Sequence, residues 1–125
     1  MKKEFRLDGN NFDDLEGFYI EIYKLMTLYE DWKPAHNLDA LNDMLYSGFG
    51  EEAILIWKNS EKSKLDLGSE ATIDFYKNKV KHGKPFNITW AKEKLEELQS
   101  EKGQTLFEIL IEIFTDHPNI DLILE

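Results

Sequence analysis

The sequence predicts a single α/β domain in which helices pack around a small parallel sheet. Three short apolar runs, at 2–7, 53–57 and 119–125, have the length of strands, and the segments between them repeat apolar residues at helical spacing. Strands separated by helical crossovers pair in parallel, with right-handed connections. A chain of 125 residues can bury the core of one such domain, so we expect one domain over residues 1–125.

The first strand is followed by the turn sequence DGNN, after which Asn11 is predicted to cap a helix. Asp13 and Asp14 then fall in the first turn, where the helix dipole favours acids. Apolar residues recur at helical spacing at Phe12, Leu15, Phe18 or Tyr19, Ile22, and Leu25 or Met26. The segment TLYEDWKPAH is expected to be a loop, because Pro34 keeps the residue before it out of helical geometry.

A second, short helix is expected to begin after Asn37 and to end at SGFG. Its apolar stripe consists of Leu38, Leu41, Met44 and Leu45. The next run, AILIW at 53–57, is almost entirely apolar, which is typical of a strand buried on both faces. The polar sequence KNSEKSKLDLGS that follows is interpreted as a turn region that can hold one helical turn.

Two further helices are expected at 69–82 and 89–101, with the turn GKPFN between them. Their apolar faces consist of Ile73, Tyr76 and Val80 in the first, and of Trp90, Leu95 (or Ala91) and Leu98 in the second. Since an apolar stripe needs a surface to cover, we expect the second helix to pack onto the domain. Thr105 and Glu108 form a capping box that begins a last helix, and NIDLILE after Pro118 is the third strand.

The net charge of −10 is unevenly distributed along the chain. Residues 65–103 contain seven acids and seven lysines, so the whole excess of acid lies in 1–64 and 104–125. An acidic surface repels nucleic acid and anionic membranes and speeds the encounter with a basic partner. The same surface can also serve solubility alone.

Composition excludes several further classes of protein. No apolar run approaches the roughly 20 residues of a membrane span, and the N-terminal lysines are not followed by the apolar core of a signal peptide. We therefore expect a cytoplasmic protein that does not bind membranes. The absence of cysteine excludes a disulfide scaffold, thiol catalysis and a thiolate zinc site.

The sequence carries few signs of catalysis. It has no glycine loop for phosphate, no serine elbow and no pair of histidines at metal-ligand spacing. His36, His82 and His117 are scattered, and we interpret them as surface or capping residues. We expect no catalytic residue, no cofactor and no metal site.

The helix after Asn37 carries two aspartates four residues apart, Asp39 and Asp43, with no cation in register. Asp39 lies near the second helical position, where an acid commonly serves the dipole and the cap. Asp43 lies beyond the first turn, and a like charge four residues before it is mildly unfavourable. Helix formation alone does not explain Asp43, which leaves a structural role and a partner-binding role open.

The sequence NLDALND, at 37–43, resembles the inhibitory-helix motif of the barstar family, the intracellular inhibitors of the ribonuclease barnase. The resemblance continues without a gap through AILIWKNSEKSK, where Trp57, Ser63 and Lys64 follow the family's pattern, and the closing EIF and IDLIL segments also fit. It implies a three-stranded parallel sheet packed by helices. Residues 65–103 replace a shorter connection of the family and are interpreted as a two-helix insertion.

The resemblance also implies a function. The chain would inhibit a basic ribonuclease or toxin nuclease, as an immunity protein does, by placing the acidic helix and the loop before it in the active site. Asp43 aligns with the family's dominant anchor, a carboxylate that occupies the site of a substrate phosphate. Asp39 aligns with the second acidic contact and Asp116 with a third acid at the interface edge. Carboxylates suit this role because they accept charge-assisted hydrogen bonds from the cations of such a site.

Four other predicted partner-binding residues depart from the family's pattern. Lys33 and His36 lie in a KPAH loop where the family has an aromatic and glycine-containing one. Asn42 replaces a tryptophan between the two aspartates, and Tyr46 follows the helix. These departures favour a cognate enzyme other than barnase. We expect the free protein to be a monomer that does not bind nucleic acid.

Two other functions remain open from the sequence. The same scaffold could bind another basic protein, or regulate expression, without inhibiting a nuclease. The chain could also be an enzyme or phospho-receiver on a doubly wound sheet. Such a protein would need more strands and an acidic cluster at their carboxyl ends, and the sequence shows neither.

Overall fold

The computed structural model describes residues 3–26, 34–46, 48–49, 52–82, 88–99 and 103–125. These residues form a three-stranded parallel sheet in the order β1-β2-β3, made of β1 (Lys3–Asp8), β2 (Ala53–Lys58) and β3 (Ile120–Leu124). The predicted sheet and its parallel pairing are confirmed, and each strand lies within one residue of its predicted ends.

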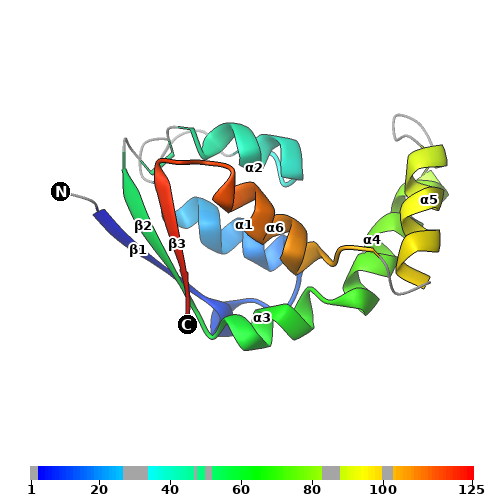
Figure 1. Ribbon diagram of the computed structural model, residues 1–125, viewed down its shortest axis with the longest axis horizontal. Helices are drawn as coiled ribbons and strands as arrows, with labels where there is room; N and C mark the ends of the chain where they lie inside the picture. The colour runs from blue at the N-terminus through cyan, green and yellow to red at the C-terminus, as the bar shows by residue number, and fades with distance from the viewer. Residues whose placement is uncertain (1–2, 27–33, 47, 50–51, 83–87, 100–102) are drawn as a thin grey trace.

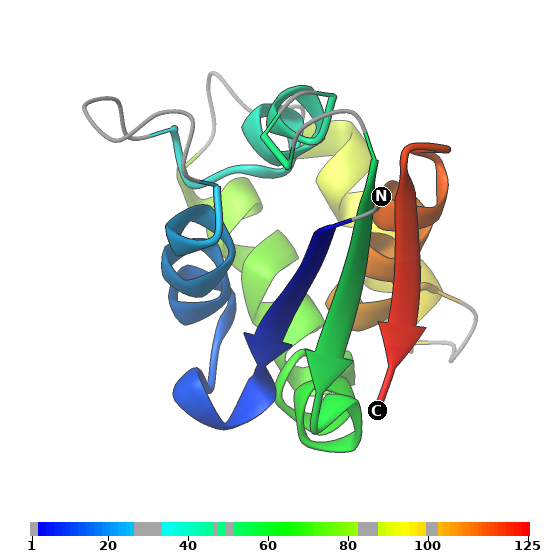
Figure 2. The same ribbon diagram turned by 90° about the vertical axis from the view of Figure 1, so that its left-hand side faces the viewer.

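The helices of the described residues are η1 (Gly9–Asn11), α1 (Leu15–Lys24), α2 (Leu38–Met44), α3 (Ser60–Asp66), α4 (Ser69–His82), α5 (Ile88–Gln99) and α6 (Leu106–Thr115). Helices α1, α2 and α6 lie on one side of the sheet, and α4 and α5 form a pair at the end of the molecule farthest from it (Figure 1). Figure 2 shows the sheet from its other side, with the helices behind it. Helix α2 thus lies along one end of the helical layer.

The central strand has one face against the helices and one face away from them. Ala53, Leu55 and Trp57 on the inner face are completely buried. On the outer face Ile56 is also buried, whereas Ile54 is half-buried. The prediction that the run 53–57 is buried on both faces is therefore confirmed except at Ile54. The alternation follows from the strand geometry, in which successive side chains point to opposite faces of the sheet.

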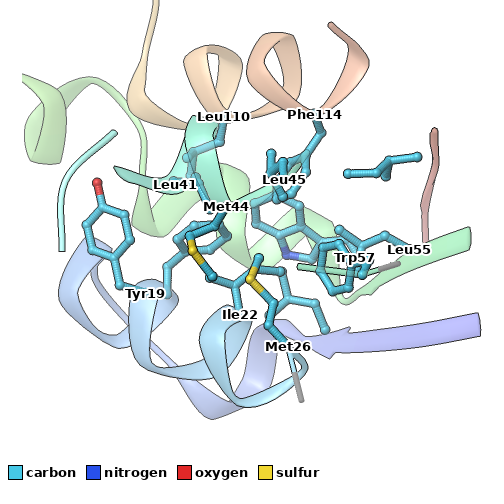
Figure 3. Packing of buried hydrophobic residues seen from close by; sticks show 14 of the residues in the cluster. Tyr19, Ile22, Met26, Leu41, Met44, Leu45, Leu55, Trp57, Leu110 and Phe114 are labelled. Carbon is cyan, nitrogen blue, oxygen red and sulfur yellow. The ribbon is translucent and has the colours of Figure 1, made fainter. Parts of the chain in front are cut away.

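Trp57 is the centre of the core (Figure 3). Its ring stacks on Phe18 of α1 with 5.5 Å between ring centroids, and it meets Phe107 and Phe114 of α6 at 5.2 and 6.2 Å. Its Nε1 donates a hydrogen bond of 2.9 Å to the Oγ of Ser63 in α3. One side chain of β2 therefore holds three helices in place.

The start of α1 differs from the prediction. Asp14 caps this helix, since its Oδ1 accepts a hydrogen bond of 2.8 Å from the Gly17 amide, whereas Asn11 lies at the end of the 3-10 turn η1. Phe12 is extended and buried, with its ring 6.4 Å from that of Trp57. Burial of Phe12 moves the start of the helix beyond the predicted cap.

Helix α3 is a complete helix where the sequence predicted a polar turn region. Asn59 redirects the chain from β2 into α3 with φ 50° and ψ 47°, a left-handed conformation that asparagine tolerates better than most residues. The side of α3 that faces the core carries Ser60 and Ser63, both buried. Because buried serines leave no apolar stripe, hydrophobic periodicity could not detect this helix.

The pair α4–α5 has a small core of its own. Tyr76 of α4 is buried with Ala91 and Leu98 of α5, and the Trp90 ring meets Tyr76 edge-on at 5.3 Å. The apolar stripe of α5 is therefore packed, as predicted, but the surface that it covers is its neighbour α4. The base of α4 is attached to α6 by Thr72, whose Oγ1 accepts a hydrogen bond of 2.7 Å from the Leu106 amide.

We expect the amides of α5 to exchange with solvent faster than those of β2, by about tenfold or more, because opening α5 exposes only the small α4–α5 core. Native-state hydrogen exchange measures the two protection factors in one experiment. Protection of α5 equal to that of β2 would contradict this division of the core.

Candidate functional site

Helix α2 is fixed in the structure by its cap and by its inner face. Asn37 Oδ1 accepts a hydrogen bond of 2.7 Å from the Ala40 amide, which confirms the predicted cap. Leu41, Met44 and Leu45 point into the same apolar cluster as Trp57 (Figure 3) and are buried. Leu38, which the sequence predicted as part of this stripe, is half-buried against the cluster.

The outer face of α2 carries the two aspartates. Asp39 and Asp43 are both exposed, as predicted. Among the residues that the structure describes, neither carboxylate forms an ion pair. The carboxylates can therefore accept hydrogen bonds from outside the chain, and the rigid inner face of α2 keeps them turned outward.

The segment that leads into α2 is held on α1 by aromatic contacts. The His36 ring stacks on Tyr19 with 5.5 Å between centroids and lies 5.9 Å from Tyr23, and its Nδ1 contacts the Glu16 carboxylate. The Tyr23 hydroxyl donates a hydrogen bond of 2.9 Å to the carbonyl oxygen of Ala35. These contacts fix the approach to α2. The predicted contact residue Lys33 lies outside the described residues.

Tyr19 has an unusual environment beneath this segment. Its hydroxyl is buried and has no hydrogen-bond partner among the described residues. Burial raises the pKa of Tyr19 most, and the negative charges of Tyr23, Glu16 and Asp39 raise it further. A buried hydroxyl without a partner destabilises the folded state, because it has lost its hydrogen bonds to water.

Replacing Tyr19 with phenylalanine is therefore expected to raise the free energy of unfolding by about 1 kcal/mol at pH 7. The difference should grow above pH 10, because the unfolded protein then loses the phenol proton while the folded protein keeps it, and native stability falls as pH rises. Urea denaturation of both proteins at pH 7 and pH 11 measures this. A variant that is less stable at pH 7 would mean that the hydroxyl has a partner in solution.

The other end of α2 contacts the turn between α6 and β3. His117 in this turn is only 2 % exposed, and its Nε2 lies 2.8 Å from Asn42 Oδ1. The Tyr46 ring covers the imidazole edge-on at 4.6 Å while remaining 69 % exposed itself. The interpretation of His117 as a surface or capping residue is wrong, because tertiary contacts bury it. Asp116, next to it, is exposed at the end of α6.

The predicted contact residues with described positions lie on α2, on the segment before it, and at the turn after α6 that contacts α2. We call this surface the acidic face and define it by Glu16, His36, Asp39, Asn42, Asp43, Tyr46 and Asp116. The sequence did not indicate Glu16 or the supporting residue His117. Both act through partners 20 and 75 residues away in the chain, and local spacing cannot reveal such pairs.

The described residues contain no cluster of three His, Asp or Glu residues that could hold a metal ion. Within the part of the chain that the structure describes, no helix has the length and apolar character of a membrane span. An open groove lies between α3 and α6, lined among others by Leu65, Ile111 and Leu124. It contains no residue of the acidic face.

Comparison with known proteins agrees with this arrangement. The family model "Barstar (barnase inhibitor)" matches residues 2–75, which is more than half of the chain and includes β1, α1, α2, β2 and α3. No curated protein and no solved structure matches the chain. The interpretation of residues 65–103 as an insertion into one domain stays a prediction. With its parallel three-stranded sheet, its helical layer and the family match over its first part, the chain belongs to the barstar family.

Proposed function

We propose that this protein is an inhibitor, not an enzyme, and that it binds a basic ribonuclease or a related toxin nuclease through the acidic face. The observation that carries the proposal is the pair of exposed carboxylates, Asp39 and Asp43, without an ion-pair partner among the described residues. The family to which the chain belongs is described by its inhibition of a ribonuclease, barnase.

The inhibitor would act by occupying the active site. A ribonuclease presents arginine, lysine and histidine to the phosphates of its substrate, and carboxylates can take the places of those phosphates. Asp43 would be the central contact, with Asp39 beside it and Asp116 at the edge. The anchored inner face of α2 and the stacked His36 reduce the conformational freedom that binding would otherwise remove. The net charge of −10 would speed the encounter with a basic enzyme.

The proposal is tested by capture followed by an activity assay. The immobilised protein is exposed to lysate and culture medium of its source cells, and each captured protein is assayed for RNA cleavage with and without the free inhibitor. We expect a basic nuclease whose activity disappears at one equivalent of inhibitor. Beads carrying the double variant Asp39→Ala, Asp43→Ala serve as the matched control and should not retain it.

Two outcomes would contradict nuclease inhibition. If the captured protein has no nuclease activity, the acidic face serves another basic partner, which is the alternative function that the sequence left open. If a nuclease is captured and remains fully active, the contact lies outside its active site.

A further inference from the structure

The hydrogen bond between His117 and Asn42 determines what Asn42 can offer to a partner. The Asn42 Oδ1 atom is an acceptor, so the His117 Nε2 at 2.8 Å must carry the proton and donate it. The other ring nitrogen, Nδ1, is buried and has no hydrogen-bond partner among the described residues. The imidazole itself is only 2 % exposed, and the Tyr46 ring meets it edge-on.

The Asn42 amide group is left with its nitrogen available. Its oxygen is engaged by His117, whereas its Nδ2 forms no hydrogen bond with any described residue. This nitrogen is also not enclosed, since the only enclosed side-chain atoms without a partner in the described residues are Tyr19 Oη and His117 Nδ1. Asn42 therefore presents two N–H donors at the surface of α2, beside the exposed carboxylates of Asp39 and Asp43.

We propose that His117 is a positioning residue that makes Asn42 a hydrogen-bond donor, and that Asn42 thereby selects the partner. The partner would present an acceptor oxygen, from a main-chain carbonyl or a side chain, between the cationic groups that meet Asp39 and Asp43. This inference rests on the proposed function and specifies it. An enzyme whose cleft presents only cations at this point would leave the Asn42 donors buried and unpaired, and its binding would be disfavoured.

The test is whether Asn42→Asp weakens or tightens binding to the captured nuclease. This variant keeps the size of the side chain and an oxygen for His117, but it replaces the two N–H donors with a carboxylate oxygen. If Asn42 donates to an acceptor, the affinity of the captured nuclease falls by about tenfold or more. If Asn42 faces only cations, the added charge tightens binding. Isothermal titration of the native protein, Asn42→Asp and Asn42→Ala against the captured nuclease measures all three affinities.

The role of His117 has its own measurements. Long-range proton–nitrogen NMR of the free protein at pH 7 should show His117 protonated on Nε2 and not on Nδ1. In His117→Phe, which keeps a ring but loses the donor, the side-chain amide signals of Asn42 should shift. Asn42→Ala should also cost at least threefold less affinity in His117→Phe than in the native protein. The reason is that His117 no longer holds the Asn42 carboxamide by its oxygen. A His117 ring protonated on Nδ1 alone would overturn the assignment. Equal losses of affinity from Asn42→Ala in the native protein and in His117→Phe would also overturn it.

Asp43→Ala, measured beside these variants, separates the two levels of the proposal. Weaker binding of Asp43→Ala together with unchanged or tighter binding of Asn42→Asp would overturn the donor role of Asn42 and leave nuclease inhibition intact. If Asp43→Ala binds as well as the native protein, the acidic face is not the contact, and both proposals fail.

Discussion

Replacing Asp43 with alanine is expected to lower the affinity for the cognate nuclease by about 30- to several-thousand-fold and to leave the stability of the free protein nearly unchanged. The first effect arises because the cations that meet this carboxylate would stay buried and unpaired in the complex. Truncating one side of a buried charge pair costs roughly 2–5 kcal/mol or more in protein complexes. The second follows from the exposure of Asp43 in the free protein.

The measurement is a binding titration of Asp43→Ala, beside urea denaturation of the free variant. Asp39→Ala should lose less affinity and Asp116→Ala less again, since charges at the edge of an interface mainly affect association rate and salt dependence. Asp74→Ala is the matched control, because it removes an equal charge from an exposed position on α4. Equal affinities for Asp43→Ala and Asp74→Ala would show that α2 is not the binding surface.

Replacing Trp57 with alanine is expected to lower the free energy of unfolding by about 3–5 kcal/mol. The indole is completely buried among rings of α1 and α6, and its loss also removes the hydrogen bond to Ser63. Small domains have only about 5–15 kcal/mol of stability in total, so this variant should unfold at a much lower urea concentration.

Trp90→Ala provides the control for this measurement. The Trp90 side chain is as large as that of Trp57, but it is 40 % exposed and contacts Tyr76 of the small α4–α5 core edge-on. Its loss should cost clearly less than that of Trp57, about 1 kcal/mol. A loss below 1 kcal/mol for Trp57→Ala, or equal losses for both variants, would contradict the central position assigned to Trp57.

The parts of the fold that the sequence predicted depend on local pattern. Strands β2 and β3 are short apolar runs, and the stripe Leu41, Met44 and Leu45 has helical spacing, so each could be recognised without tertiary information. Helix α3 was not predicted because its buried side consists of serines, whose place in the core depends on the Trp57 ring and on the end of β3.

The candidate site also has residues that the sequence could indicate and contacts that it could not. Asp39 and Asp43 stood out because their charges have no local compensation, which is a property of the sequence itself. The contacts of Glu16 with His36 and of His117 with Asn42 join distant segments, so only the folded structure could reveal them. The burial of His117 likewise follows from the packing of the α6–β3 turn on α2 and not from any motif.

In the proposed complex, the carboxylates of α2 occupy the place of substrate phosphates in a nuclease. Competition between this protein and a mononucleotide for the captured enzyme tests this placement of the carboxylates. We expect mutually exclusive binding, in which the apparent dissociation constant of the inhibitor rises linearly with nucleotide concentration above the nucleotide's own dissociation constant. Simultaneous binding, with a dissociation constant that does not change as nucleotide is added, would place the acidic face outside the active site and contradict inhibition by occupation of that site.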